Sequence, residues 1–475
     1  MMSKLSAFCM IICVAGVGFM SCNSKTEELE YTLPSSALVK SFSLSANDSV
    51  LDNLDKVFFS IDLNNGNIFN ADSMPYGTKI NKLIPVITTG GAKAVELVVP
   101  RPGKSDTTYN YVENPKDTID FSNGIVKLKI QSIDESVTME YKISINVHKI
   151  KSDSLSWGDM AYTSLPTNLN NVTAQHTLKF NGKLYCMTTD GTSYCLSTTE
   201  NPATKLWEHT SVNFGFKPDV ETFRASASAL YILDENGSLY KSEDSGANWS
   251  ATGHTFAYLI GGYGDNVIGT TKNGDVWTIT STDGSTVNAP SDFPVTGTSV
   301  PVDYSFPMSA SHQFTIVGGR MANGELTPNA WGYDGTSWAC LSNVPLPEGL
   351  EGATLTPYYS FEENEYWVAT RESLLLLIGG RTSEGVCNDT TYISYDYGVS
   401  WRKAPELMQM PTNIPSLYGA QTIVVTSMLG SRASVAITSW ECPYIYMFGG
   451  RNRNGEQVNS VWRGVINRLS FKPLQ

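Results

Sequence analysis

Histidine and positive charge are both scarce in this chain. Lys and Arg total 33 against 46 Asp and Glu, which gives a net charge of −13, and no basic stripe breaks the acidic pattern. Such a surface repels phosphate backbones, so nucleic acid is excluded from the expected partners. The chain has only 5 histidines, and those after residue 150 show no paired spacing: His176, His209, His254 and His312. A copper site held by histidines is therefore not predicted.

Catalytic and cofactor signatures are also missing. The sequence contains no GxSxG, HExxH or P-loop pattern, which removes the positive case for the enzymes that depend on them. Cys340, Cys387 and Cys442 have no metal-ligand spacing, and we interpret them as buried apolar residues. We predict neither a metal nor a cofactor. A glycosidase or lyase with unfamiliar motifs stays open.

One apolar stretch, residues 5–20, follows Lys4 and ends in Ser21-Cys22. It is too short and wrongly flanked for a membrane span, and it resembles a bacterial lipoprotein signal. That resemblance implies a signal peptide over 1–21 and a lipid on Cys22 as the sole membrane contact. The alternative is an ordinary secretory signal with an incidental cysteine. The acidic tether 22–30 resembles surface-export signals of Gram-negative lipoproteins, so we expect an outer-membrane, cell-surface location, with a periplasm-facing one as the alternative.

Export would place the remaining cysteines in an oxidising compartment. A two-residue turn at Asp190-Gly191 would put Cys186 directly opposite Cys195 in a β-hairpin, within disulfide range. We therefore predict a cross-strand disulfide, and the alternative is two buried thiols.

Residues 31–150 contain no tryptophan and read as an all-β sandwich. A hairpin with a turn at Asn65-Gly66 is predicted over 57–68. Further strands are predicted around 83–87, 94–99, 124–130 and 138–147, and the last alternates with Met139, Tyr141 and Ile143 on one face. The segments PYGTKI at 75–80 and YKISI at 141–145 resemble immunoglobulin-like modules of Gram-negative surface lipoproteins. The resemblance implies a spacer or docking domain.

Residues 152–475 repeat one pattern six times: an apolar strand, a turn, a second strand and a segment that usually ends in Trp. The second strands start at LYC 184–186, LYI 230–232, VIG 267–269, FTI 314–316, LLL 375–377 and IYM 445–447. Repeats of this length predict a six-bladed β-propeller. The sixth repeat lacks its closing segment, which stands upstream at Leu155-Ser156-Trp157. We expect an N-terminal outer strand around Trp157 to close the ring.

Two motifs mark particular repeats. The sequences IVGGR 316–320, LIGGR 377–381 and MFGGR 447–451 resemble the kelch family, whose fold is a propeller. The octapeptides SEDSGANW 242–249 and SYDYGVSW 394–401 are similar to Asp-boxes, which occur in sialidases and other propellers. Asp-boxes are structural: the Asp caps a turn, the Gly takes positive φ and the Trp packs between blades. These roles fall on Asp244, Gly246, Trp249, Asp396, Gly398 and Trp401.

Strand alternation assigns loops to faces. The Gly-Gly-Arg loops and the long links 345–364 and 405–431 share one face, and the other face is expected to be trimmed. Arg320, Arg381 and Arg451 occupy equivalent positions, with Arg453 nearby, and would suit a carboxylate, sulfate or sugar hydroxyls. The alternative is that each pairs with a neighbouring loop. Arg224 and Arg432 are interpreted as channel residues or inter-blade ion pairs.

Tyr358 and Tyr359 in the first of these links are candidates for stacking on sugar rings, or else they fix a long loop. The predicted function is non-catalytic recognition of a glycan or an envelope protein. The alternatives are a carbohydrate-active enzyme using the same face and a scaffold subunit of an envelope complex. Sialidase-like enzymes share the Asp-boxes, but their Arg-Ile-Pro entry motif is missing from the first repeat, and galactose-oxidase-like enzymes need the copper site excluded above.

Overall fold

The computed structural model describes residues 35–158, 164–305, 312–363, 369–430 and 439–467. These residues divide into two compact units, one of residues 35–70 and 79–145 and one of residues 71–78 and 146–467. The predicted signal peptide 1–21, the tether 22–30 with Cys22, and Arg432 lie outside the described residues. No helix in the described ranges is long and apolar enough to cross a membrane.

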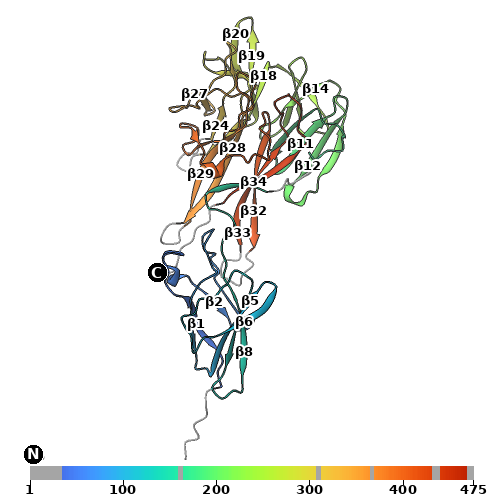
Figure 1. The fold of residues 1–475 in the computed structure, drawn as a ribbon. Coiled ribbons are helices and arrows are strands. Elements are labelled where there is room, and N and C mark those ends of the chain that lie inside the picture. The colour runs from blue at the N-terminus through green and yellow to red at the C-terminus, as the bar shows by residue number, and fades with distance from the viewer. Residues whose placement is uncertain (1–34, 159–163, 306–311, 364–368, 431–438, 468–475) are drawn as a thin grey trace, which may run out of the picture. The chain divides into compact units, whose positions relative to one another are not determined.

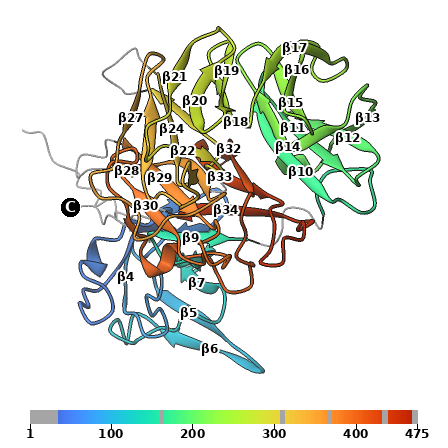
Figure 2. The same cartoon turned by 90° about the horizontal axis from the view of Figure 1, so that it is seen from above.

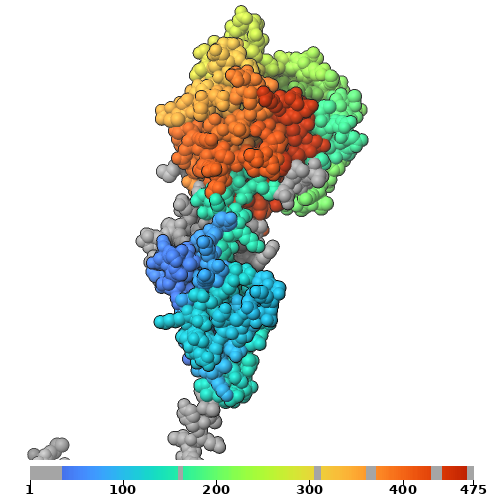
Figure 3. Space-filling model, viewed as in Figure 1, coloured from blue at the N-terminus to red at the C-terminus, as the bar shows by residue number. Residues whose placement is uncertain are grey.

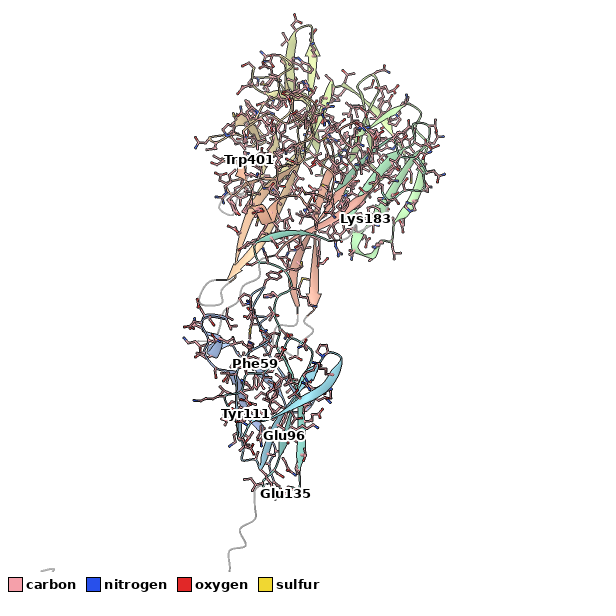
Figure 4. All side chains as sticks on the ribbon, in the orientation of Figure 1. Phe59, Glu96, Tyr111, Glu135, Lys183 and Trp401 are labelled. Atoms are coloured by element: carbon pink, nitrogen blue, oxygen red, sulfur yellow. The ribbon has the colours of Figure 1, made fainter. Side chains whose placement is uncertain are left out.

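The first unit consists of two sheets and one turn of 3-10 helix, η1 Leu54–Lys56. Strands β1 Val39–Leu44 and β4 Pro85–Thr89 form an antiparallel pair. A six-stranded sheet has the order β2 Ser60–Asp62, β3 Asn67–Phe69, β8 Thr138–Ser144, β7 Val126–Gln131, β5 Ala94–Arg101 and β6 Lys104–Asn110, in which only β3 and β8 run parallel. Tyr141 and Ile143 are buried, as the alternation in β8 predicted. Phe59 packs edge-on against Phe42 with ring centroids 4.9 Å apart (Figure 4).

The second unit is built from four-stranded antiparallel sheets, six of them in the part of the chain that is described. The first three use strands consecutive in the chain, which is the hairpin-after-hairpin order that short turns allow. Sheet one is β10 Ala174–Phe180, β11 Lys183–Thr189, β12 Tyr194–Thr199 and β13 Glu208–Val212; sheet two is β14 Pro218–Ala225, β15 Leu230–Asp234, β16 Ser238–Ser242 and β17 Ser250–Thr255; sheet three is β18 Tyr258–Tyr263, β19 Asn266–Asn273, β20 Val276–Ser281 and β21 Thr286–Asn288.

The last three sheets follow the same order with short additions. Sheet four is β23 Val302–Ser305, β24 His312–Val317, β26 Ala330–Tyr333 and β27 Trp338–Cys340; sheet five is β28 Thr354–Glu363, β29 Ala369–Ile378, β30 Tyr392–Ser394 and β31 Arg402–Lys403; sheet six is β32 Gln421–Gly430, β33 Ser439–Phe448, β34 Val461–Asn467 and β9 Ser154–Trp157. A separate ribbon pairs β22 Pro294–Thr296 with β25 Arg320–Met321, and η2 Pro202–Thr204 and η3 Glu406–Met408 are single 3-10 turns.

The outer strand of sheet six comes from upstream of sheet one. Trp157 of β9 faces Gly464 of β34, and Ser154 faces Asn467. The sequence segment around Trp157 therefore fills the position that the sixth repeat leaves open. The side chain of Asn467 adds a hydrogen bond of 2.7 Å to the Ser156 hydroxyl.

First strands make many of the contacts between neighbouring sheets of the second unit. Contacts join β10 to β14, β14 to β18, β23 to β28 and β28 to β32, and they also join β10 to β32. Figure 2 shows the sheets in chain order, from green through yellow and orange to red, and Figure 3 shows the orange and red segments side by side. The side-chain Nε2 of Gln175 in β10 donates to the side-chain Oε1 of Gln421 in β32 at 2.7 Å. The first and last sheets of the series are thus neighbours.

In the turns at 242–249 and 394–401 an aspartate accepts hydrogen bonds from within its own turn. The Asp244 carboxylate accepts hydrogen bonds from the Asn248 amide and from the Ser242 hydroxyl, both at 2.8 Å. These bonds, led by that from Asn248, lower the pKa of Asp244 to about 2. Gly246 adopts φ +95°, and the equivalent Gly398 adopts φ +99°. Trp249 lies 5.4 Å from the Phe214 ring, and Trp401 is buried among residues of sheets four and five (Figure 4).

The prediction of one trimmed face is wrong. The hairpins β28–β29 and β32–β33 each pair over ten residues, well beyond the three-residue β30 of sheet five (Figure 1). Residues 354–363 and 421–430, which were read as parts of loops, are first strands that carry the chain across to the opposite face. Their β-branched residues and the long register with their partners favour strand over loop.

The predicted disulfide is also wrong, because the hairpin turn is longer than expected. The Asp190 side chain accepts from the amides of Thr192 and Ser193 at 2.9 and 2.7 Å, which makes a four-residue loop over 190–193. The register moves by two residues, so Cys186 faces Ser197 and Cys195 faces Thr188. Both thiols are buried and free. Of the cysteines expected to be buried, Cys340 is exposed, and Cys387 and Cys442 are only half-buried.

Candidate functional site

The three Gly-Gly-Arg loops lie between the second and third strands of sheets four to six, as predicted. A Cβ on Gly318 would lie 2.2 Å from the Leu350 carbonyl oxygen, and one on Gly379 would lie 2.1 Å from that of Leu417. Glycine is required here because another segment of backbone passes directly beside it. The close approach brings each arginine against the link that leads into the next sheet.

Arg320 and Arg381 pair with the link that precedes sheet five, and Arg451 pairs with β14 of sheet two. Arg320 Nη2 and Arg381 Nη2 lie 2.9 and 2.8 Å from the same Glu351 oxygen, Oε2. Arg451 Nη2 lies 2.5 Å from Glu221 Oε1. Burial raises the pKa of Glu351, but the hydrogen bonds from Arg320 and Arg381 outweigh it, so the pKa is lowered below its ordinary value. Glu351 is therefore a carboxylate at neutral pH. The arrangement is the inter-loop pairing that the sequence left as an alternative to ligand binding.

A cavity of about 240 Å³ opens among these loops and the starts of the first strands. Its charged lining consists of Arg224, Arg381, Arg451, Glu221 and Glu351. Aromatic and amide groups complete the wall: His176, Tyr258, Tyr418, Gln175, Gln421 and Gln457. The cavity thus combines cationic forks, carboxylates and neutral donors and acceptors in one small space.

The predicted site residues divide into those that line the cavity and those that do not. Arg381 and Arg451 line it, whereas Arg320 does not, although it shares Glu351 with Arg381. Arg453 is exposed and outside the lining. Arg224, interpreted from sequence as a channel residue or an ion-pair partner, lines the cavity.

The two tyrosines proposed as a stacking surface are elsewhere. Tyr358 is a core residue of β28: its ring is buried, and its hydroxyl donates to the Pro443 carbonyl at 2.9 Å. Tyr359 is half-buried beside Arg371, whose guanidinium lies 3.9 Å from its ring centroid. Neither residue lines the cavity. They were misassigned because the link was read as a loop, and a strand fixes where each side chain points.

Arg224 is the central group of the site. Its Nε donates to the Ile260 carbonyl at 3.0 Å, and its Nη1 donates to the Glu221 and Phe223 carbonyls at 2.9 and 3.0 Å. Nη1 also lies 3.1 Å from Nε2 of His176. Burial and the neighbouring Arg224 charge hold the pKa of His176 well below its ordinary value. The imidazole is therefore neutral, and the guanidinium carries the charge of the pair.

A run of glycines forms the rim of the cavity, and sequence inspection missed it. The Gly352 amide donates to the Gly297 carbonyl at 2.8 Å, and the Gly419 amide donates to the Gly352 carbonyl at 2.7 Å. The three glycines stand in equivalent links, each before a first strand. The available signal was the repeated Thr296-Gly297, Glu351-Gly352 and Tyr418-Gly419 dipeptide, whose first residue faces Arg320, Arg381 or Arg451.

Two further cavities adjoin the first. One of about 490 Å³ shares His176, Arg224 and Gln421 with it, and one of about 790 Å³ shares Glu221, Arg224 and Tyr258. Arg224 is common to all three. In the described ranges no group of three His, Cys, Asp or Glu side chains is arranged to hold a metal ion.

Comparison with known proteins identifies the two units. The profile of a family described as the DUF6242 beta propeller domain matches residues 151–474, and that of the DUF6242 N-terminal domain, of unknown function, matches residues 35–145. No curated protein matches the chain. Among solved structures it is similar to YCF48 from Cyanidioschyzon merolae, at 12% identity over 66% of this chain and 98% of that one, with a TM-score of 0.29. It is also similar to the Niastella koreensis GH74 enzyme, at 12% identity over 73% of this chain and 48% of that one, with a TM-score of 0.32.

Proposed function

Since this chain belongs to the DUF6242 family, whose larger domain is a β-propeller, we propose that it is a non-catalytic binding protein that holds a saccharide in the cavity at Arg224. The observation that carries the proposal is the lining itself. Arg381 and Arg451 present fork-shaped donors, Glu221 and Glu351 present acceptors, and Tyr258 and Tyr418 add aromatic rings, of which Tyr418 carries the Arg381 guanidinium on one face. Sugars offer hydroxyls that both donate and accept, together with an apolar ring face, and this mixture suits them.

The ion pairs favour binding over catalysis. A glycoside hydrolase needs one carboxylic acid that stays protonated, which requires a raised pKa. The pKa of Glu351 is lowered instead, because two arginines donate to it. Glu221 is occupied by Arg451, which lies within 2.7 Å of it through Nε. Both carboxylates therefore serve to position arginines.

A glycan array tests the proposal. The purified protein would be screened beside an Arg381→Ala, Arg451→Ala double variant and an Arg453→Ala control, which changes an exposed arginine of the same loop. We expect binding by the wild type and the control and a loss of at least tenfold in the double variant. If the double variant does not fold, a Gln457→Ala variant replaces it in the test. This change removes a neutral lining group and should also weaken binding.

The array also separates the alternatives. Absence of glycan binding by the wild type would overturn the proposal and favour an envelope protein as the partner, to be sought by pull-down. Two carboxylates in one cavity favour a carbohydrate-active enzyme, and so does Asp219 in the adjoining cavity, because burial raises the pKa of its carboxyl group. Incubating array hits with the protein and following the products by mass spectrometry tests this: turnover abolished by both Glu221→Gln and Glu351→Gln would replace binding with catalysis.

We further propose that the six sheets are the blades of one closed, kelch-like ring and that the first unit is an immunoglobulin-like spacer. The contact of β10 with β32 and the pairing of β9 with β34 support ring closure. We propose export as a lipoprotein, anchored through Cys22 to the outer membrane and facing the cell exterior. Radiolabelled palmitate incorporated by the wild type and not by Cys22→Ala, together with protease digestion of intact cells, tests the anchor and the side of the membrane.

A further inference from the structure

We propose that Arg224 anchors an anionic group, so that the ligand of the cavity is an acidic saccharide, recognised by the carboxylate of a uronic acid. This inference rests on the proposed saccharide-binding function and specifies its ligand class. It starts from the way in which Arg224 differs from the other arginines of the site.

Arg224 is a buried cation held by neutral groups. Its exposure is 7%, and its hydrogen bonds run to the carbonyls of Glu221, Phe223 and Ile260 and to the neutral ring of His176. Nη2 takes part in none of these bonds. Burial lowers the pKa of Arg224, and the groups that favour its charge are the Tyr258 hydroxyl and, more weakly and without direct contact, the carboxylates of Asp219 and Glu221. Carbonyl dipoles orient the guanidinium, but they add no negative charge to it.

A carboxylate partner is the missing element. Arg320, Arg381 and Arg451 each lie within 4.0 Å of a glutamate oxygen, whereas no carboxylate of the described residues approaches Arg224 that closely. Burying a charge without a counter-charge is costly, and arginine does not relieve the cost by losing its proton. An anion from the ligand would supply what the protein leaves out.

The charge balance of the lining points the same way. Three arginines and two glutamates face the cavity, which leaves one positive charge in excess on a protein whose net charge is −13. One carboxylate neutralises that excess, and its two oxygens match the fork of a guanidinium. A doubly charged phosphate would instead leave the cavity negative.

Access and size fit the end of a saccharide chain. Arg224 borders the 240 Å³ cavity and both of the larger ones, so its side chain belongs to the walls of all three. The central cavity is smaller than the roughly 300 Å³ at which ordinary ligand pockets begin. It suits one sugar residue, and the adjoining cavity of about 490 Å³, which Lys179 also lines, can receive the residues that follow.

Matched pairs of sugars test the inference by calorimetry. D-glucuronate would be compared with D-glucose, D-galacturonate with D-galactose, and an oligogalacturonate with a neutral oligosaccharide of the same length. We expect the acidic member to bind about tenfold more tightly, because a charge-assisted bond replaces a neutral one. Arg224→Gln should abolish this preference, and the Arg453→Gln control should keep it.

A second variant covers the case in which Arg224→Gln does not fold, which its melting curve would reveal. Glu221→Gln removes a negative charge from the lining and should raise the affinity for the acidic member of each pair relative to its neutral partner. Equal binding of acidic and neutral sugars by the wild type would overturn this inference and leave the proposed function standing. Binding of no saccharide at all would overturn both.

Discussion

Glu351 and Arg381 are joined twice, once through the backbone and once through the side chains. Each donates its amide N–H to the carbonyl of the other at 2.8 Å, and Arg381 Nη2 lies 2.8 Å from Glu351 Oε2. The same carboxylate oxygen also receives Arg320 from the preceding sheet. One glutamate thus connects the loops of sheets four and five, and its loss should be felt in both.

The first prediction is that Glu351→Gln destabilises the second unit by about 1–3 kcal/mol at pH 7, because two guanidinia lose a charged acceptor. The folded-state pKa of Glu351 is lowered. Its stabilisation is therefore present above the unfolded pKa of about 4.3 and is lost as pH falls through the folded value. Urea unfolding at pH 7 and pH 3.5 should show the gap between wild type and variant narrowing in acid. A gap that is the same at both pH values would contradict this role.

The second prediction concerns the Gly-Gly pairs. Gly379→Ala should destabilise the protein by about 2 kcal/mol more than Gly385→Ala, because overpacking adds to backbone strain. Both glycines have positive φ, but a Cβ on Gly379 would lie 2.1 Å from the Leu417 carbonyl oxygen, whereas one on Gly385 meets nothing within 4 Å. Thermal unfolding of both variants separates the backbone strain, which both share, from the steric clash, which only Gly379→Ala has. Equal losses of stability would mean that the clash is relieved by a local shift.

The third prediction concerns the junction between the first and last sheets. Gln421 accepts from the Gln175 side chain at 2.7 Å and from the Thr177 amide at 3.2 Å, all in buried surroundings. Gln421→Leu should cost about 1–3 kcal/mol, since it leaves a buried donor without its acceptor. Gln313→Leu is the matched control, because that side chain bonds to Thr315 of its own strand. If denaturant unfolding gave the same loss of stability for both variants, the hydrogen bonds of Gln421 would not stabilise the junction between the first and last sheets.

The fourth prediction concerns thiol chemistry. Burial raises the pKa of Cys186 to about 12, and Cys195 is likewise enclosed. Neither should react with iodoacetamide in the native protein, whereas the exposed Cys340 should label readily. Peptide mass spectrometry after native and denaturing alkylation checks this. A Cys186–Cys195 peptide surviving without reductant would restore the disulfide.

Strand identity was more predictable than strand length or turn length. All six predicted second strands are second strands in the structure, because each apolar run is bounded by turn residues that fix its place. The prediction that the links are loops failed for a physical reason. An aromatic residue such as Tyr358 cannot be assigned to a strand from sequence until its partner strand is known. The Cys186 register failed because the Asp190 side chain extends its turn by two residues, a choice that local hydrogen bonds decide.

The site was predictable only in outline. Of the three equivalently spaced arginines, Arg381 and Arg451 line one cavity and Arg320 does not, although repeats place like residues around a common centre. The glutamates that pair with these arginines could not be predicted in the same way. Glu221 lies 230 residues from Arg451 along the chain, and no periodic pattern connects them. The importance of Arg224 depends on what surrounds it after folding.

The strand order of sheet six also determines the order in which the strands can pair during folding. Ser154 of β9 and its partner Asn467 are 313 residues apart, so β9 leaves the ribosome long before the strand that it pairs with has been made. Closing so long a loop is entropically slow. The edge of β34 therefore stays unpaired until β9 reaches it. Sheets one to three, whose strands are consecutive, can form in the meantime and present β10 as a surface on which β32 and then the last pairing are completed. A chain truncated just before β34 would therefore lack the β9–β34 pairing, which is the final step of assembly, and β9 would have no partner strand.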